Sequence, residues 1–371
     1  MTWAEHHRES QHLVAAAETA ARQGDRRLAR ALYADAAAAE ESALAAVDDT
    51  KTRTLGISAV SATSLRYKAG QYQLAEAAAY KWLARGDLPT FATSQLKELL
   101  EAVWNEASRQ QAGVQFAPGQ VIVSVKGGEV IRGGAPLDLI VEKVQTVKAL
   151  FHRTAEFLRG EPYRRTGPAS AEIQEMFRPW IFQAAPGSYQ FAVAVQEPAQ
   201  GSFLRPDGPT SVDVAGHFLT ILRVSAEDPD EGLLAIVQDE SYRGTFLTLA
   251  RNLAPTGRTF DTLEVRASDQ PRPITLAAST RRAINEVKRK TRPAQVGTSA
   301  ASTEDTIHGV LRAVHLDLDW LEVSTGGETL RISEVGEAVD DVIGPMVNRP
   351  VVLRIVRGPR GPLFRDIEPD E

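Results

Sequence analysis

The feature that most constrains the fold is the alanine content of the first part of the chain. Within residues 11–50, 15 of 40 residues are alanine, the residue with the highest helix propensity. Apolar residues recur there at intervals of three and four, for example Leu13, Ala16 and Ala20. This period is typical of an amphipathic helix and predicts an all-helical N-terminal region.

Turn residues divide residues 1–110 into five predicted helices. Capping residues and helix breakers stand at Gly24-Asp25, Asp48-Asp49-Thr50, Gly70 and Gly86-Asp87-Leu88-Pro89. A first helix is expected to end before Gly24, and four more are expected over residues 25–47, 51–68, 71–84 and 90–110.

Small and aromatic residues stand at fixed distances from Gly24. The positions seven before it and five, nine and twelve after it hold Ala17, Ala29, Tyr33 and Ala36. This pattern resembles tetratricopeptide-type helical hairpins, although the next match, from Gly70, follows after 46 residues instead of 34. The resemblance implies a helical-hairpin domain over residues 1–111 that binds a partner protein on its concave face. The same small residues also allow close helix packing without any binding role.

Residues 112–292 mix the patterns of strands and helices without a regular β–α–β period, which predicts an α+β domain. Strands are expected over residues 120–126, 129–132, 188–195, 260–266 and 272–276, and helices over residues 137–158, 211–224, 233–237, 242–253 and 279–290. The first two strands, joined by Gly127-Gly128, are expected to pair as a hairpin. With its strand hairpin, its long helix and a strand introduced by Pro186-Gly187-Ser188, this part resembles uncharacterised bacterial proteins.

A linker and a small barrel are expected in the last part of the chain. Residues 293–305 are small and polar, as in linkers. Five strands are expected over residues 307–314, 320–324, 329–332, 351–356 and 363–367, with a short helix over residues 334–339. This order resembles an oligonucleotide/oligosaccharide-binding barrel or an SH3-like barrel over residues 306–371. The predicted fold class is therefore multidomain α+β.

Composition excludes several classes of protein. The absence of cysteine rules out a disulfide scaffold, a thiol nucleophile and cysteine-ligated metals. A net charge of −6 argues against a general nucleic-acid coat. No stretch approaches 18 consecutive apolar residues, so we expect no transmembrane helix. Residues 1–8 lack the pattern of a signal peptide, and the expected location is cytoplasmic.

No motif commits the chain to a chemistry. The sequence lacks the histidine spacing of zinc proteases, the serine elbow of hydrolases and the lysine of a phosphate-binding loop. Asp213 and His217 are one helical turn apart, but no serine can be matched to them, and Asp239-Glu240 and Asp340-Asp341 fit turn and capping roles. We therefore expect no cofactor and no metal and favour a protein without enzymatic activity. The possibility of an active site assembled from residues across 113–292 remains as an alternative.

The candidate binding residues lie in a basic segment at the end of the α+β part. On a helix, Arg281, Arg282, Lys288, Arg289 and Arg292 would form a cationic stripe. Such charge suits contact with nucleic-acid phosphates. A solvated helix face, or an electrostatic contact with another domain, explains the same residues without nucleic acid.

Two functions follow from these observations. The first is an adaptor that binds a partner protein through residues 1–111, in a bacterial regulatory or defence system. The alternative is a regulator that binds nucleic acid through residues 281–292 and the C-terminal barrel.

Overall fold

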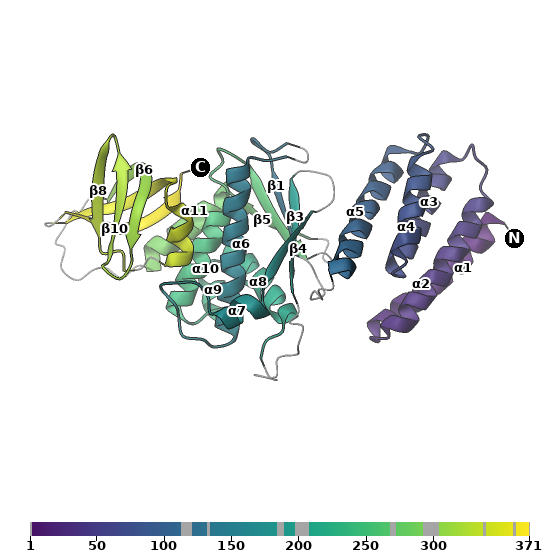
Figure 1. The fold of residues 1–371 in the computed structure, drawn as a ribbon, viewed down its shortest axis with the longest axis horizontal. Coiled ribbons are helices and arrows are strands. Elements are labelled where there is room, and N and C mark those ends of the chain that lie inside the picture. Colours follow the sequence, from purple (N-terminus) through teal and green to yellow (C-terminus); the bar gives the residue numbers. More distant parts are fainter. Residues whose placement is uncertain are drawn as a thin grey trace. The chain divides into compact units, whose positions relative to one another are not determined.

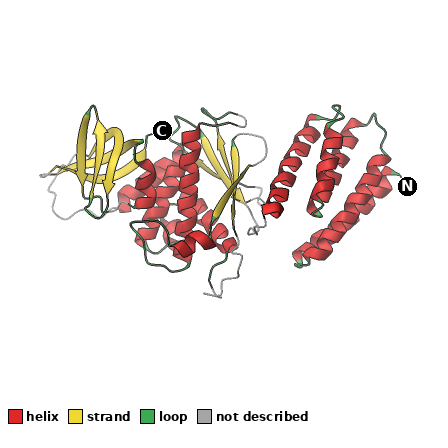
Figure 2. Ribbon diagram, viewed as in Figure 1, coloured by secondary structure: helices red, strands yellow, loops and turns green. Residues whose placement is uncertain are grey.

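The computed structural model describes residues 2–112, 121–131, 134–183, 189–196, 208–267, 272–291, 304–336, 339–358 and 361–370 (Figures 1 and 2). It is a mixed α+β structure. Its internal contacts divide the chain into two compact units. The first comprises Met1–Val114 with Gln183–Pro186, and the second comprises Gln115–Phe182 and Gly187–Glu371. The further division of the second unit into an α+β domain, a linker and a barrel domain stays a prediction.

The described helices of the first unit follow one another as hairpins, and each packs against the next. They are α1 (Trp3–Arg22), α2 (Arg26–Ala45), α3 (Thr52–Lys68), α4 (Tyr72–Leu83) and α5 (Thr90–Ala112). All five predicted helices are confirmed within a few residues. The first begins well before the alanine-rich run, because Thr2 and Glu5 form a capping box there.

Alanine and glycine shape these hairpins in different ways. Ala17, Ala36 and Ala75 are completely buried between helices, where a small side chain lets neighbouring backbones approach closely. Gly24 and Gly70 have φ angles of 83° and 75°, in the left-handed region that ends helices α1 and α3. The sequence signals around Gly24 and Gly70 therefore correspond to real helix ends.

A five-stranded sheet forms the centre of the α+β part of the second unit. Its strand order is β2-β3-β1-β4-β5, and β1 pairs antiparallel with both β3 and β4. The strands are β1 (Val121–Lys126), β2 (Pro179–Gln183), β3 (Gln190–Val195), β4 (Thr262–Ala267) and β5 (Ile274–Ala277). Val121, Val123 and Val125 alternate along β1 and are buried in the core, as a two-residue period requires.

Helices pack beside this sheet (Figure 1). They are α6 (Leu137–Leu158), α7 (Ala171–Met176), α8 (Ser211–Glu227), α9 (Glu231–Ile236), α10 (Glu240–Leu253) and α11 (Ala278–Thr291). Phe151 of α6 and Phe218 of α8 stack with ring centroids 4.2 Å apart at the centre of the core. Apolar faces in the sequence predicted α6, α8, α9, α10 and α11, and α6 has the expected bounds, whereas α7 was not among the expected helices.

The last described strands form a sheet that closes on itself in the order β10-β8-β7-β6-β9. The elements are β6 (Glu304–His315), β7 (Trp320–Thr325), β8 (Glu328–Ser333), α12 (Asp340–Ile343), a 3-10 turn (Gly344–Met346), β9 (Pro350–Gly358) and β10 (Gly361–Pro369). Its buried residues, such as Leu321 and Leu353, belong to the same contiguous core as those of the α+β part. The closed sheet and the α+β part therefore share one core.

Two local predictions are wrong. The sequence predicts a strand over residues 129–132 that pairs with β1; residue 132 lies outside the described residues, and both edges of β1 are occupied by β3 and β4. Glu129 instead donates its backbone N–H to the Thr259 carbonyl at 2.8 Å. The sequence predicts a short helix over residues 334–339, of which 337 and 338 lie outside the described residues. Glu334 has a left-handed φ of 62° that a helix does not accept, and the described helix, α12, begins at Asp340.

Residues 292–303, which include Arg292 and most of the predicted linker 293–305, lie outside the described residues. Glu304 and Asp305, the last two positions of that predicted linker, already belong to β6. The strand therefore begins before residue 306, where the barrel was expected to start.

Candidate functional site

Arg281, one of the predicted site residues on the basic helix α11, is buried in the protein interior. Arg281 is 6% exposed, and its Nε donates to Glu368 of β10 at 3.0 Å. The same side chain donates to the carbonyl oxygens of Arg251 and Ala254 at the end of α10. Arg281 therefore joins α10 and α11 to the closed sheet. An electrostatic contact of this kind is the alternative to nucleic-acid binding that the sequence left open for the basic segment.

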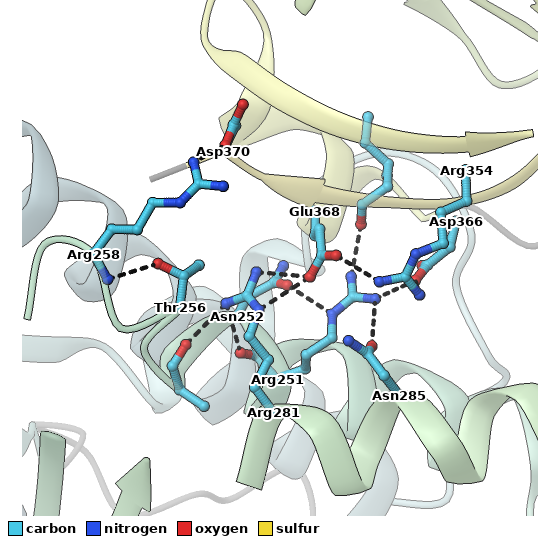
Figure 3. A network of polar contacts seen from close by, with 12 residues as sticks. Arg251, Asn252, Thr256, Arg258, Arg281, Asn285, Arg354, Asp366, Glu368 and Asp370 are labelled. Carbon is cyan, nitrogen blue, oxygen red and sulfur yellow. Dashed lines mark hydrogen bonds and ion pairs between the residues drawn. The ribbon is translucent and has the colours of Figure 1, made fainter. Parts of the chain in front are cut away.

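Three acidic residues alternate at and just after the end of β10, and they face Arg281 and other basic side chains (Figure 3). Asp366, Glu368 and Asp370 are spaced by two, so they project from the same side of an extended chain. Asp366 pairs with Arg251 and Lys288, and Asp370 pairs with Arg258 at 2.7 Å. We call the group of Arg251, Arg281, Lys288, Arg354, Asp366 and Glu368 the β10 ion network.

The β10 ion network favours ionised carboxylates despite their burial. Burial alone would raise the pKa of Asp366, but Arg251, Lys288 and Arg354 outweigh it and hold this pKa below its usual range. The pKa of Glu368 is lowered in the same way, against burial, by Arg251, Arg281 and Arg354. The network thus holds two buried carboxylates among four cations, and this excess of positive charge keeps both carboxylates ionised.

The five predicted site residues do not form one surface. Arg281 and Lys288 belong to the β10 ion network, whereas Arg282 and Arg289 are exposed. Arg282 and Arg289 are seven positions apart on α11 and therefore share a face. Arg292 lies outside the described residues.

A second buried charge cluster was missed by sequence reasoning. Arg153 of α6 is completely buried, and its Nε lies 2.7 Å from Asp341 of α12. Arg164 reaches both Glu156 at 2.9 Å and Asp341 at 2.8 Å. The sequence suggests a turn or capping role for Asp341, but its carboxylate pairs with both Arg153 and Arg164 in this cluster. The three-residue spacing of Arg153 and Glu156 on one helix was the available signal.

The residues weighed for catalysis have structural roles. The Asp213 carboxylate accepts from the Thr210 backbone N–H and closes a capping box at the start of α8. His217 Nδ1 lies 2.9 Å from the Asp213 carbonyl oxygen, not from its carboxylate. Among the described residues, no three His, Asp or Glu side chains are grouped so that they could hold a metal ion. None of the described helices combines the length and the apolar composition that a membrane span requires.

An aromatic pair is exposed on the first unit. Tyr80 of α4 and Trp104 of α5 are 50% and 45% exposed, and their ring centroids are 6.5 Å apart. The Trp104 indole N–H donates to Glu76 Oε1 at 2.8 Å, which fixes the ring on the helix surface. We call these two residues the Tyr80–Trp104 pair. Exposed rings held in one orientation offer contact area at little cost in side-chain entropy.

No family model, curated protein or solved structure matches this chain. The likeness of residues 1–111 to tetratricopeptide hairpins therefore rests on its own residues.

Proposed function

We propose that this protein is an adaptor whose first unit binds a partner protein. The observation that carries the proposal is the exposed, mutually packed Tyr80–Trp104 pair. Tyrosine and tryptophan are the residues most often found at the energetic centres of protein interfaces. Hairpins of the tetratricopeptide type, which the first unit resembles in sequence, would give this pair a rigid support.

The partner surface that would suit this site is apolar with a basic rim. The two rings offer flat apolar area, and Glu76 places a carboxylate beside them. An aliphatic side chain packed on the rings, with a neighbouring lysine or arginine near Glu76, would satisfy both features. The interaction would combine burial of ring area with a charge-assisted hydrogen bond.

The experiment compares full-length variants against one identified partner. The wild-type protein is used to isolate partners from its own cells in the presence of nuclease, and the affinity of the purified partner is then measured. Combined Tyr80→Ala and Trp104→Ala substitutions should weaken binding by about 2 kcal/mol or more, roughly 30-fold. Leu28→Ala is the matched control, because Leu28 is 48% exposed on α2. Equal affinities of the pair variant and the wild type would contradict the proposal.

Nucleic-acid binding is the second candidate, and the exposed face of α11 supports it. Arg282 and Arg289 share that face, but Arg281 and Lys288 are paired with Glu368 and Asp366. The charge available for phosphates is therefore smaller than the sequence suggested. A 20-base-pair fluorescent duplex titrated at several salt concentrations tests this function: the double variant Arg282→Gln, Arg289→Gln should weaken binding and flatten its salt dependence.

The same proposal includes the type of the closed sheet and the cellular location of the protein. The closed sheet would be an oligonucleotide/oligosaccharide-binding-like or SH3-like barrel, consistent with its five-stranded closed order. The protein would act in the cytoplasm, in a bacterial regulatory or defence system, without a cofactor.

A further inference from the structure

A cavity of about 400 Å³ lies in the second unit between the helices and the closed sheet. Helices α10 and α11 form one side, and α12, β9 and β10 form the other. This volume is in the lower part of the range of small-molecule sites and is too small for a folded partner. The cavity is lined by residues of the second unit, whereas the Tyr80–Trp104 pair belongs to the first.

Apolar side chains from both sides line part of the cavity. Leu247 of α10 faces it together with Ile343 of α12 and Phe364 of β10. All three are at most 5% exposed, so they are held in place by the core behind them. The apolar lining suits an aliphatic or aromatic body on a ligand.

Gly244 keeps one wall of the cavity open. It lies inside α10, where glycine lowers helix stability relative to alanine. No atom lies within 4 Å of the position that a Cβ would occupy there, so close packing does not require glycine. The missing side chain leaves room in the cavity beside α10.

The charged lining of the cavity is more cationic than acidic. Its cations are Arg165, Arg243, Lys288, Arg289, Arg354 and Arg365, against the acids Asp230, Glu240, Glu304 and Asp366. Asp366 is already paired with Arg251 and Lys288. Arg289, in contrast, makes no ion pair with any residue in the described part of the chain. Arg289 therefore has charge available for a ligand.

We propose that this cavity binds a small organic anion, in which a carboxylate or sulfonate group is attached to an apolar body. The anionic group would pair with Arg289 at the end of α11. The apolar body would lie on Leu247, Ile343 and Phe364. Because the walls come from both the helices and the closed sheet, the bound anion would add contacts between them and raise the melting temperature of the second unit.

The test uses the purified full-length protein and two fluorescent probes. One is 1-anilinonaphthalene-8-sulfonate, and the other is its uncharged relative N-phenyl-1-naphthylamine. The sulfonate should bind with one-to-one stoichiometry and raise the melting temperature. Gly244→Phe, which fills the cavity, should weaken its binding at least about tenfold. Gly216→Phe in α8 is the matched control, because Gly216 also has no atom within 4 Å of an added Cβ and does not line the cavity.

The role of the charge is tested at Arg289, which is exposed and can be changed without disturbing the core. Arg289→Gln should weaken binding of the sulfonate by several-fold and leave binding of the uncharged amine unchanged. Displacement of the sulfonate by decanoate or by 1-naphthoate would support the proposal. The stronger competitor would show whether the cavity prefers an anion with an aliphatic or an aromatic apolar body.

Three outcomes would overturn the proposal. One is the absence of one-to-one sulfonate binding to the wild type. Another is equal weakening by Gly244→Phe and Gly216→Phe. The third is equal loss of both probes in Arg289→Gln. Because Arg289→Gln changes only an exposed side chain, the test does not depend on the folding of the Gly244 variant.

Discussion

Arg251 of α10 and Asp366 of β10 form an ion pair across 115 positions of sequence. Arg251 is completely buried, and it also donates to the Ile367 carbonyl at 2.6 Å. Such a pair adds little net stability compared with apolar packing, but removing one partner leaves an uncompensated buried charge. The pair therefore links α10 directly to β10 of the closed sheet.

Loss of the Asp366 carboxylate should strongly destabilise the protein. Asp366→Asn removes the charge that neutralises Arg251, and we expect the free energy of unfolding to fall by about 3–5 kcal/mol. Urea denaturation of the full-length protein measures this change. Asp305→Asn is the control, because its partner Arg357 is 82% exposed, and such pairs contribute below about 1 kcal/mol. Equal losses in the two variants would show that the Arg251–Asp366 pair has no special role.

Neighbouring arginines on α11 should respond differently to the same substitution. Arg281→Gln removes the bonds to Glu368 and to two carbonyl oxygens, and should cost about 2–4 kcal/mol. Arg282→Gln changes an exposed side chain and should stay within about 0.5 kcal/mol of the wild type. Thermal unfolding compares the two. A large effect at Arg282 would mean that α11 is oriented differently.

Stability should fall with acid below about pH 4.5. The pKa values of Asp366 and Glu368 lie below their ordinary values of 3.8 and 4.5, so the unfolded chain takes up protons first. Their contribution is complete above pH 4.5 and is lost as the pH falls toward their folded values. Urea midpoints between pH 3 and pH 6 measure this slope. Glu368→Gln should reduce the slope, and an unchanged slope would contradict the assignment.

His152 should make the free energy of unfolding depend on pH between about 4 and 6.5, a higher range than that of the two carboxylates. Burial, with a smaller contribution from Lys148, lowers the pKa of His152 from 6.5 to about 4. Between these values the unfolded chain binds a proton that the folded chain does not, so stability should rise with pH there. The rise is at most about 3 kcal/mol. His152→Gln should remove it, and the same pH profile in both proteins would refute the prediction.

Local sequence signals predicted the helices well. Gly24 and Gly70 ended helices where expected, and the apolar face from Leu137 to Leu158 gave the bounds of α6. These features depend on backbone conformation and on residues three or four apart, which the sequence displays directly. The strand expected over residues 129–132 was wrong because pairing depends on which strand edges are free, and distant β3 and β4 occupy both edges of β1.

The roles of charged residues were much less predictable. Arg281 and Arg282 are adjacent in sequence, yet one is buried against Glu368 and the other is exposed. Asp341 looked like a turn residue, yet it pairs with Arg153 and Arg164. The alternating acids of β10 were visible in the sequence, but their partners lie on elements that are distant along the chain.

The sequence by itself determined the all-helical first unit, the strand-rich last part and the order of most elements between them. Helix propensity, apolar period and turn chemistry depend on residues a few positions apart, so they can be recognised from short stretches of sequence. Only the tertiary structure decided which cations of α11 are neutralised, which rings of the first unit stay exposed and where the helices and the closed sheet leave a cavity. Each of these depends on burial and on distances between residues far apart in the chain, because a charge or an aromatic ring acquires its role from what packs against it.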